Sequence, residues 1–91
     1  MTMRIIDHCD QIEEYIFQDL NVEDPSTYII PPGTDITPAF RWGSFPPLKA
    51  ICLEHNPGDC KYELLFATEE DAQGYWKELY LDLEGFEEAK V

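Results

Sequence analysis

Three cysteines and two histidines are the residues of this sequence that could bind a metal ion. Cys52 and His55 are separated by two residues, and Cys60 follows five residues later. Zinc accepts thiolate and imidazole ligands, but a tetrahedral site needs them all to converge within about 2.0–2.3 Å of the ion. Because side chains alternate between the two faces of a strand, Cys52 should point away from the face that His55 shares with Cys60. We therefore expect the cysteines to pack as small apolar groups, with no metal and no cofactor.

The same residues offer little for catalysis. A pair formed by Cys60 and His55 has the residue types of a thiolate nucleophile and its base, but no third group is evident to orient the histidine. The five glycines are isolated, so the chain contains no glycine-rich phosphate-binding loop. Three cysteines are also too few, and odd in number, for a disulfide scaffold. We expect a protein that is not an enzyme, and a small metal or redox protein remains an alternative.

The charge of the chain limits its partners. Nineteen acidic residues against six basic ones give a net charge of −13 over 91 residues. The scattered basic residues form no patch, so we expect no direct binding to nucleic acid or to an anionic membrane surface. No apolar run is long enough to span a bilayer, and charge interrupts the first apolar stretch, so we expect no signal peptide and a cytoplasmic location.

The acidic residues fall into two blocks on either side of a neutral middle. Residues 7–24 and residues 63–91 each carry a net charge of −7. Self-repulsion of this size destabilises a small fold, and a basic partner protein would relieve it, although acidic surfaces also serve solubility alone. Carboxylates three or four residues apart on a helix lie about 5–6 Å apart, a spacing that could imitate a row of phosphates. The acidic partner-binding candidates are Asp7, Asp10, Glu13, Glu14, Asp71, Glu78 and Asp82.

An aromatic cluster in a proline-rich segment is the second candidate surface. Residues 25–47 contain six prolines, which exclude a regular helix. Within this segment, the residue types that dominate binding hot spots occur together. These residues are Phe40, Arg41, Trp42 and Phe45. Their aromatic rings could equally be buried, since a small domain needs large side chains in its core.

Two helices are predicted, one near each end of the chain. The spacing of Ile5, Cys9, Ile12, Ile16 and Leu20 predicts a helix over residues 5–19. Alternatively, residues 3–6 form a short strand and Asp7 caps the helix. Near the other end, Thr68 is a natural N-cap with Asp71 at the capping-box distance. Ala72, Trp76, Leu79 and Leu83 then share one face of a helix that Gly85 should end.

Residues 48–66 predict a β-hairpin that turns at residues 56–59. Pairing outward from Pro57 and Gly58 gives the facing pairs His55–Cys60, Glu54–Lys61, Leu53–Tyr62 and Ile51–Leu64. This register makes one buried face of Ile51, Leu53, Tyr62, Leu64 and Phe66. A lone hairpin is marginally stable, so we expect a third strand from residues 25–47.

The sequence thus predicts one α+β domain over residues 1–91. A small antiparallel sheet, made of the hairpin and a third strand, should be packed by an N-terminal and a C-terminal helix. The function that we expect is a small acidic protein-binding module, in its most specific form an inhibitor or nucleic-acid mimic that engages a basic nuclease, toxin or defence complex. The alternative is a non-catalytic accessory subunit that docks on a larger assembly through the aromatic segment.

Overall fold

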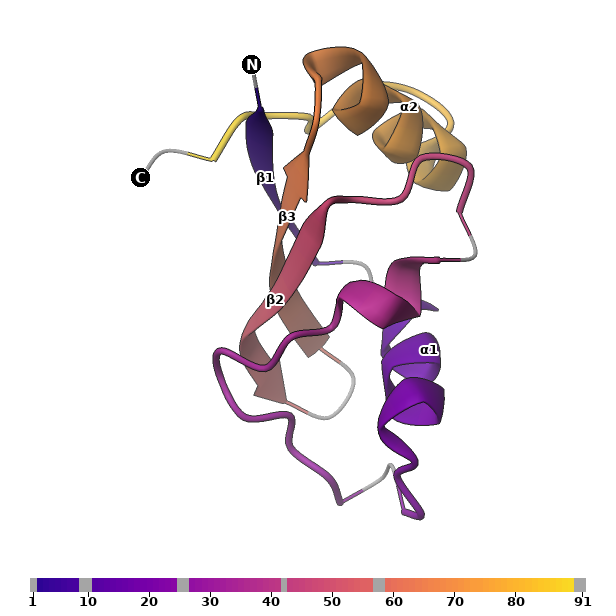
Figure 1. Ribbon diagram of the computed structural model, residues 1–91, viewed down its shortest axis with the longest axis vertical. Coiled ribbons are helices and arrows are strands. Elements are labelled where there is room, and N and C mark those ends of the chain that lie inside the picture. Colours follow the sequence, from indigo (N-terminus) through magenta and orange to yellow (C-terminus); the bar gives the residue numbers. More distant parts are fainter. Residues whose placement is uncertain (1, 9–10, 25–26, 42, 57–58, 90–91) are drawn as a thin grey trace.

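The three strands form one antiparallel sheet with the helices on one of its faces. The computed structural model describes residues 2–8, 11–24, 27–41, 43–56 and 59–89, and for residues 11 and 12 only the backbone. The elements are β1 (Met3–Asp7), α1 (Gln11–Leu20), the 3-10 helix η1 (Thr37–Phe40), β2 (Lys49–Asn56), β3 (Asp59–Phe66) and α2 (Glu69–Tyr80) (Figure 1). The sheet order is β1-β3-β2. The predicted α+β fold, with a helix on each side of the hairpin in sequence, is confirmed.

The third strand comes from the N-terminal residues and not from the proline-rich segment. β1 pairs antiparallel with β3 and places Ile5 opposite Leu64. The helix predicted from Ile5 begins at Gln11, so the alternative of a short N-terminal strand is right and Asp7 ends that strand instead of capping a helix. A spacing of four residues fits both a helical turn and a strand of period two, which is why the apolar pattern alone did not separate them.

The segment before η1 covers the outer edge of β2 without becoming a strand. The N–H of Gly33 donates to the carbonyl of Cys52 at 2.7 Å, and the N–H of Ile36 donates to Ala50 at 2.8 Å. Asp35 and Ile51 form an isolated bridge. Prolines at positions 31, 32 and 38 lack the N–H that a regular ladder needs. The prediction of a third strand from this segment is wrong, but the segment still pairs part of an exposed sheet edge.

The hairpin register is right beside the turn and wrong beyond it. The pairs His55–Cys60 and Glu54–Lys61 form as predicted. An irregularity between Cys52 and Glu54 then shifts the pairing, so that Cys52 and not Leu53 lies opposite Tyr62. Because a slip of one residue exchanges the two faces of a strand, Ala50 and Cys52 are buried, whereas Ile51 and Leu53 are only partly buried. The turn residues Pro57 and Gly58 lie outside the described residues.

α2 begins as predicted and ends earlier. The Thr68 hydroxyl oxygen accepts the N–H of Asp71 at 3.1 Å, which confirms the N-cap. The helix ends at Tyr80, and Leu81 follows in the left-handed conformation with φ 68°, so the expected end at Gly85 is wrong. Leu83 lies beyond the helix and does not share its buried face. Within the described ranges, we find no helix with the length and apolar character needed to cross a membrane.

Candidate functional site

Asp7 lies in the core and does not contribute to an acidic surface. Its side chain is 1% exposed. Its Oδ2 atom accepts the hydroxyl of Tyr75 at 2.7 Å and that of Tyr62 at 3.3 Å, and its Oδ1 atom accepts the hydroxyl of Tyr80. The N–H of His8 also donates to Oδ1, at 2.7 Å. This carboxylate therefore joins the end of β1 to β3 and α2, and the prediction of Asp7 as a partner-binding residue is corrected to a structural role.

Glu13 also faces the interior. Its Oε2 atom lies 3.3 Å from Nε2 of the buried His55. The other ring nitrogen of His55, Nδ1, accepts the N–H of Ile30 at 2.9 Å. An imidazole whose Nδ1 accepts a hydrogen bond carries its proton on Nε2. Nε2 of His55 and Oε2 of Glu13 are both buried and lie close together, but their geometry does not make a hydrogen bond. Neither nitrogen of this ring keeps a lone pair for a metal ion.

The bulge in β2 brings the two described cysteines to the same buried face as His55, contrary to the alternation that we expected for Cys52. Both thiols are fully buried. Burial raises the pKa of Cys60 to about 12 and also raises the pKa of Cys52. Both groups are therefore thiols and poor nucleophiles at neutral pH. In the part of the chain that the structure describes, which omits Cys9, no group of three or more His, Cys, Asp or Glu residues is placed to hold a metal.

The buried Cys60 thiol predicts a loss of stability in alkali. In the unfolded chain it ionises near the usual pKa of 9.0, whereas in the folded state its pKa is about 12. Stability is fully present below pH 9 and falls as the pH rises towards 12, because the unfolded state releases its proton first. We expect the titration of Cys60 to lower the free energy of unfolding by about 1 kcal/mol between pH 8 and pH 10, with Cys52 adding to the loss, as measured by urea denaturation.

The matched variant for this measurement is Cys60→Ala. It should be less stable than wild type at pH 8 because it leaves a small cavity, but its stability should change less between the two pH values. An equal loss of stability in wild type and variant would show that Cys60 is not the titrating group.

The remaining acidic residues of the first block do not form the predicted row. Asp7 lies on β1 and not on α1, and Asp10 lies outside the described residues. Asp19 is 3.6 Å from the guanidinium of Arg41. Glu14 is exposed on α1. Three of the seven acidic residues of the first block, namely Asp7, Glu13 and Asp19, therefore lie beside groups of the fold itself.

The aromatic segment is divided between core and surface. Phe40 is 2% exposed, and its ring centroid lies 5.4 Å from that of Tyr62, so it belongs to the core. Phe45 is 39% exposed and lies against α2, where a Cβ atom at Gly74 would come within 2.7 Å of its ring. Trp42 lies outside the described residues. The prediction of Phe40 as a partner-binding residue is therefore corrected to a core residue, whereas Phe45 remains partly accessible.

The second acidic block remains on the surface. Residues 69–89 contain eight acidic residues and one basic residue, Lys77. Seven of the eight acidic residues are exposed, and Asp71 is partly buried. We call this set the α2 acidic surface. It consists of Glu69, Glu70, Asp71, Glu78, Asp82, Glu84, Glu87 and Glu88.

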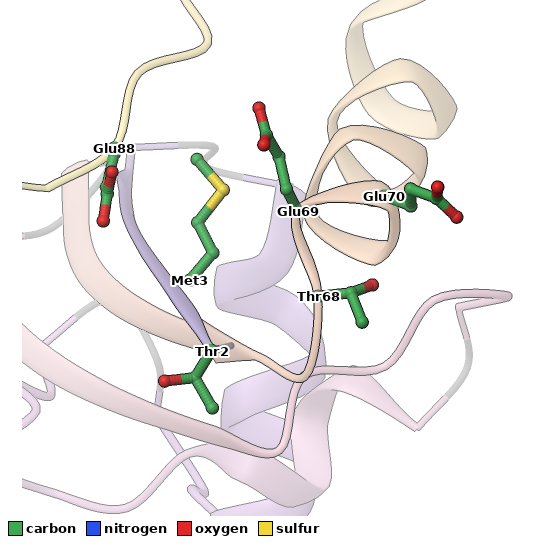
Figure 2. Close-up of a pocket in the computed structure, with 6 residues that line it drawn as sticks. All are labelled: Thr2, Met3, Thr68, Glu69, Glu70 and Glu88. Carbon is green, nitrogen blue, oxygen red and sulfur yellow. The ribbon is translucent and has the colours of Figure 1, made fainter.

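The chain after α2 returns to the start of β1 and extends this surface. The N–H of Ala89 donates to the carbonyl of Arg4 at 2.7 Å, and Glu88 forms an isolated bridge with Ile5. Glu88 and Glu69 consequently line one open hollow of about 480 Å³, with Met3 between them (Figure 2). Carboxylates in the first turn of α2 also favour the helix dipole, which accounts for Glu69 in structural terms alone. The helix dipole does not account for the position of Glu88, which is set by the pairing of the C-terminal segment with β1. This pairing places Glu88 in the same hollow as Glu69 and Glu70 from the start of α2.

Within the α2 acidic surface, Glu78 and Asp82 also have local partners. Glu78 accepts the N–H of Ser44 at 3.3 Å, and Asp82 accepts the N–H of Glu84 at 2.8 Å. Each still keeps oxygen atoms towards solvent, because both side chains are exposed. Of this surface, these two residues and Asp71 were predicted from the sequence as partner-binding residues, and the other five members were not. The net charge of residues 63–91 was the sequence signal that could have indicated them. The charge does not show that Glu88 pairs with Ile5 of β1.

Comparison with known proteins adds no relationship: no protein-family model, no curated protein and no solved structure matches the chain.

Proposed function

We propose that this chain is a small acidic protein-binding module that engages a basic surface of a partner protein. The observation that carries the proposal is the α2 acidic surface, whose eight carboxylates share residues 69–89 with one lysine, Lys77, and adjoin one further lysine of β3, Lys61. In its most specific form the module is an inhibitor that occupies a cationic groove in the manner of a nucleic acid. Partners of this kind include a nuclease, a toxin or a nucleic-acid-guided defence complex.

The arginine ion pairs of the described residues lie outside the α2 acidic surface. Arg41 lies 3.6 Å from Asp19 of the first acidic block, and Arg4 lies 3.1 Å from Glu63, a residue of the second block that stands on β3. A concentrated excess of negative charge on a small protein attracts an oppositely charged partner and speeds association. Like charges gathered at one end of the fold repel one another, and a cationic partner would remove this repulsion.

The test is differential capture of partners from a lysate of the host. The immobilised wild-type protein is compared with a variant that neutralises Glu69, Glu70 and Glu88 to glutamine. A control variant makes the same change at three exposed glutamates remote from α2. These are Glu14, Glu23 and Glu54.

We expect wild type and control to retain the same basic protein and the α2 variant to lose it. Affinity for the recovered protein should fall about tenfold or more in the α2 variant, and binding should weaken strongly between about 50 and 500 mM salt because surface charge pairs are screened. Equal binding by the two variants, or binding that salt does not change, would show the proposal to be wrong.

A further inference from the structure

The turn that follows α2 presents apolar side chains to solvent. Leu81 is 89% exposed, and its neighbours Tyr80 and Leu83 are 36% and 37% exposed. The hydroxyl of Tyr80 is directed inward to Asp7, and its ring packs against Trp76 with centroids 4.5 Å apart, so Leu81 is the most exposed apolar side chain of the turn. A fully exposed leucine on its own needs no explanation, but the backbone beneath this one is unusual.

Leu81 occupies a position where glycine is normally found. Its φ of 68° and ψ of −3° are left-handed, and its N–H donates to the carbonyl of Lys77 at 2.8 Å to close α2. Helices commonly end in this way with glycine, because a side chain is disfavoured in the left-handed conformation. Glycine or asparagine would therefore suit both the backbone and the solvent better than leucine. The leucine side chain thus carries a conformational cost, and at 89% exposure it buries little apolar area in return.

The turn around Leu81 is fixed by hydrogen bonds to the helix. The indole N–H of Trp76 donates to the carbonyl of Glu84 at 2.9 Å, and the N–H of Phe86 donates to Leu83 at 3.0 Å. The rings of Trp76 and Phe86 also pack edge to face, with centroids 5.8 Å apart. The backbone of the turn is held in one shape before any partner arrives, which lowers the entropy lost on binding.

Carboxylates flank the exposed apolar side chains along the chain. Glu78, Asp82 and Glu84 are exposed within three residues of Leu81, with Lys77 as the single base nearby. An apolar centre with a charged rim is the usual anatomy of a binding hot spot. Because the rim is acidic, a second copy of this chain is repelled, and the complementary surface is an apolar recess bordered by lysine or arginine.

We propose that residues 80–84 dock into an apolar recess, bordered by basic side chains, on the partner protein, and that Leu81 is the side chain inserted there. This inference rests on the proposed function and specifies the partner surface that the module would recognise. Charge on the α2 acidic surface provides steering, and the leucine provides the contact that slows dissociation.

The test uses two fluorescein-labelled helical peptides of equal positive charge, one that combines lysine with leucine and one that combines lysine with alanine. Fluorescence anisotropy measures their affinity for wild type and for the variants Leu81→Gly and Leu81→Asn. The control is Ile29→Ala, which removes another exposed aliphatic side chain, 48% exposed, away from α2. Thermal unfolding of each variant is measured alongside, since both Leu81 substitutions suit a left-handed backbone and should leave Tm unchanged or higher.

We expect wild type and Ile29→Ala to prefer the lysine–leucine peptide by about tenfold, as for burial of a leucine side chain. The Leu81 variants should lose this preference, keep their affinity for the lysine–alanine peptide and keep its salt dependence. A preference that persists in the Leu81 variants, or that disappears equally in Ile29→Ala, would overturn the inference. So would a dimer of the wild-type chain in sedimentation that Leu81→Gly abolishes.

The two proposals fail in different ways in this experiment. Neutralising Glu69, Glu70 and Glu88 should weaken both peptides equally and leave the ratio between them unchanged. If that variant binds both peptides as wild type does, the acidic surface is not the binding site. The role of Leu81 is tested separately, by the ratio of the two peptide affinities in wild type and in the Leu81 variants.

Discussion

Replacement of Asp7 by alanine is expected to lower the free energy of unfolding by about 3 kcal/mol, because buried hydroxyls then lose their charged acceptor. The hydroxyls of Tyr62, Tyr75 and Tyr80 all donate to this carboxylate, whose side chain is 1% exposed. A buried donor left without a partner typically costs about 1–3 kcal/mol, and some of these hydroxyls can find each other or water after the change. Urea denaturation followed by circular dichroism measures the loss.

Two companion variants make this measurement specific. Asp7→Asn retains the shape and one acceptor oxygen but removes the charge, so its loss should be smaller than that of alanine. Glu14→Ala removes an exposed carboxylate and should change the free energy of unfolding by less than about 0.5 kcal/mol. If Asp7→Ala were as mild as Glu14→Ala, the tyrosine hydroxyls would not depend on this carboxylate for stability.

Asp7 and Glu88 show that the net charge of a segment does not predict which of its acidic residues are exposed. Both belong to acidic blocks of equal net charge, yet one is buried and the other extends an exposed edge. The charge of the second block indicated an acidic surface correctly, because seven of the eight acidic residues between positions 69 and 89 are exposed. It could not locate Asp7, whose burial depends on tyrosines 55 to 73 residues away in the sequence.

The elements set by local chemistry were predictable, and those set by distant pairing were not. The cap at Thr68 and the register next to the hairpin turn depend on residues a few positions apart, and both were predicted correctly. The pairing of β1 with β3 joins residues about sixty positions apart, and the bulge near Leu53 adjusts β2 to its neighbours. The sequence pattern contains no local signal for either, since apolar spacing reports only a period.

Phe40 and Phe45 should respond very differently to truncation, although the sequence analysis placed them on one docking surface. Phe40→Ala is expected to lower the free energy of unfolding by about 3–4 kcal/mol, because it removes a buried ring and leaves a cavity beside Tyr62 and Tyr75. Phe45→Ala removes a ring that is 39% exposed, and should lower it by about 1 kcal/mol or less. Paired urea denaturation curves measure both changes.

Phe45→Ala also distinguishes the two proposed functions, the acidic module and the accessory subunit that docks through its aromatic segment. In the acidic module, Phe45→Ala remains folded and binds the captured basic partner with an affinity within about twofold of wild type, because the substitution removes an uncharged ring that packs on Gly74 and leaves every carboxylate in place, including Glu78 beside it. In the accessory subunit, Phe45 is the accessible anchor, and its loss should weaken binding about tenfold or more while stability changes little. A large loss of affinity in a well-folded Phe45→Ala would therefore favour docking through residues 43–47 and would count against the α2 acidic surface as the main contact.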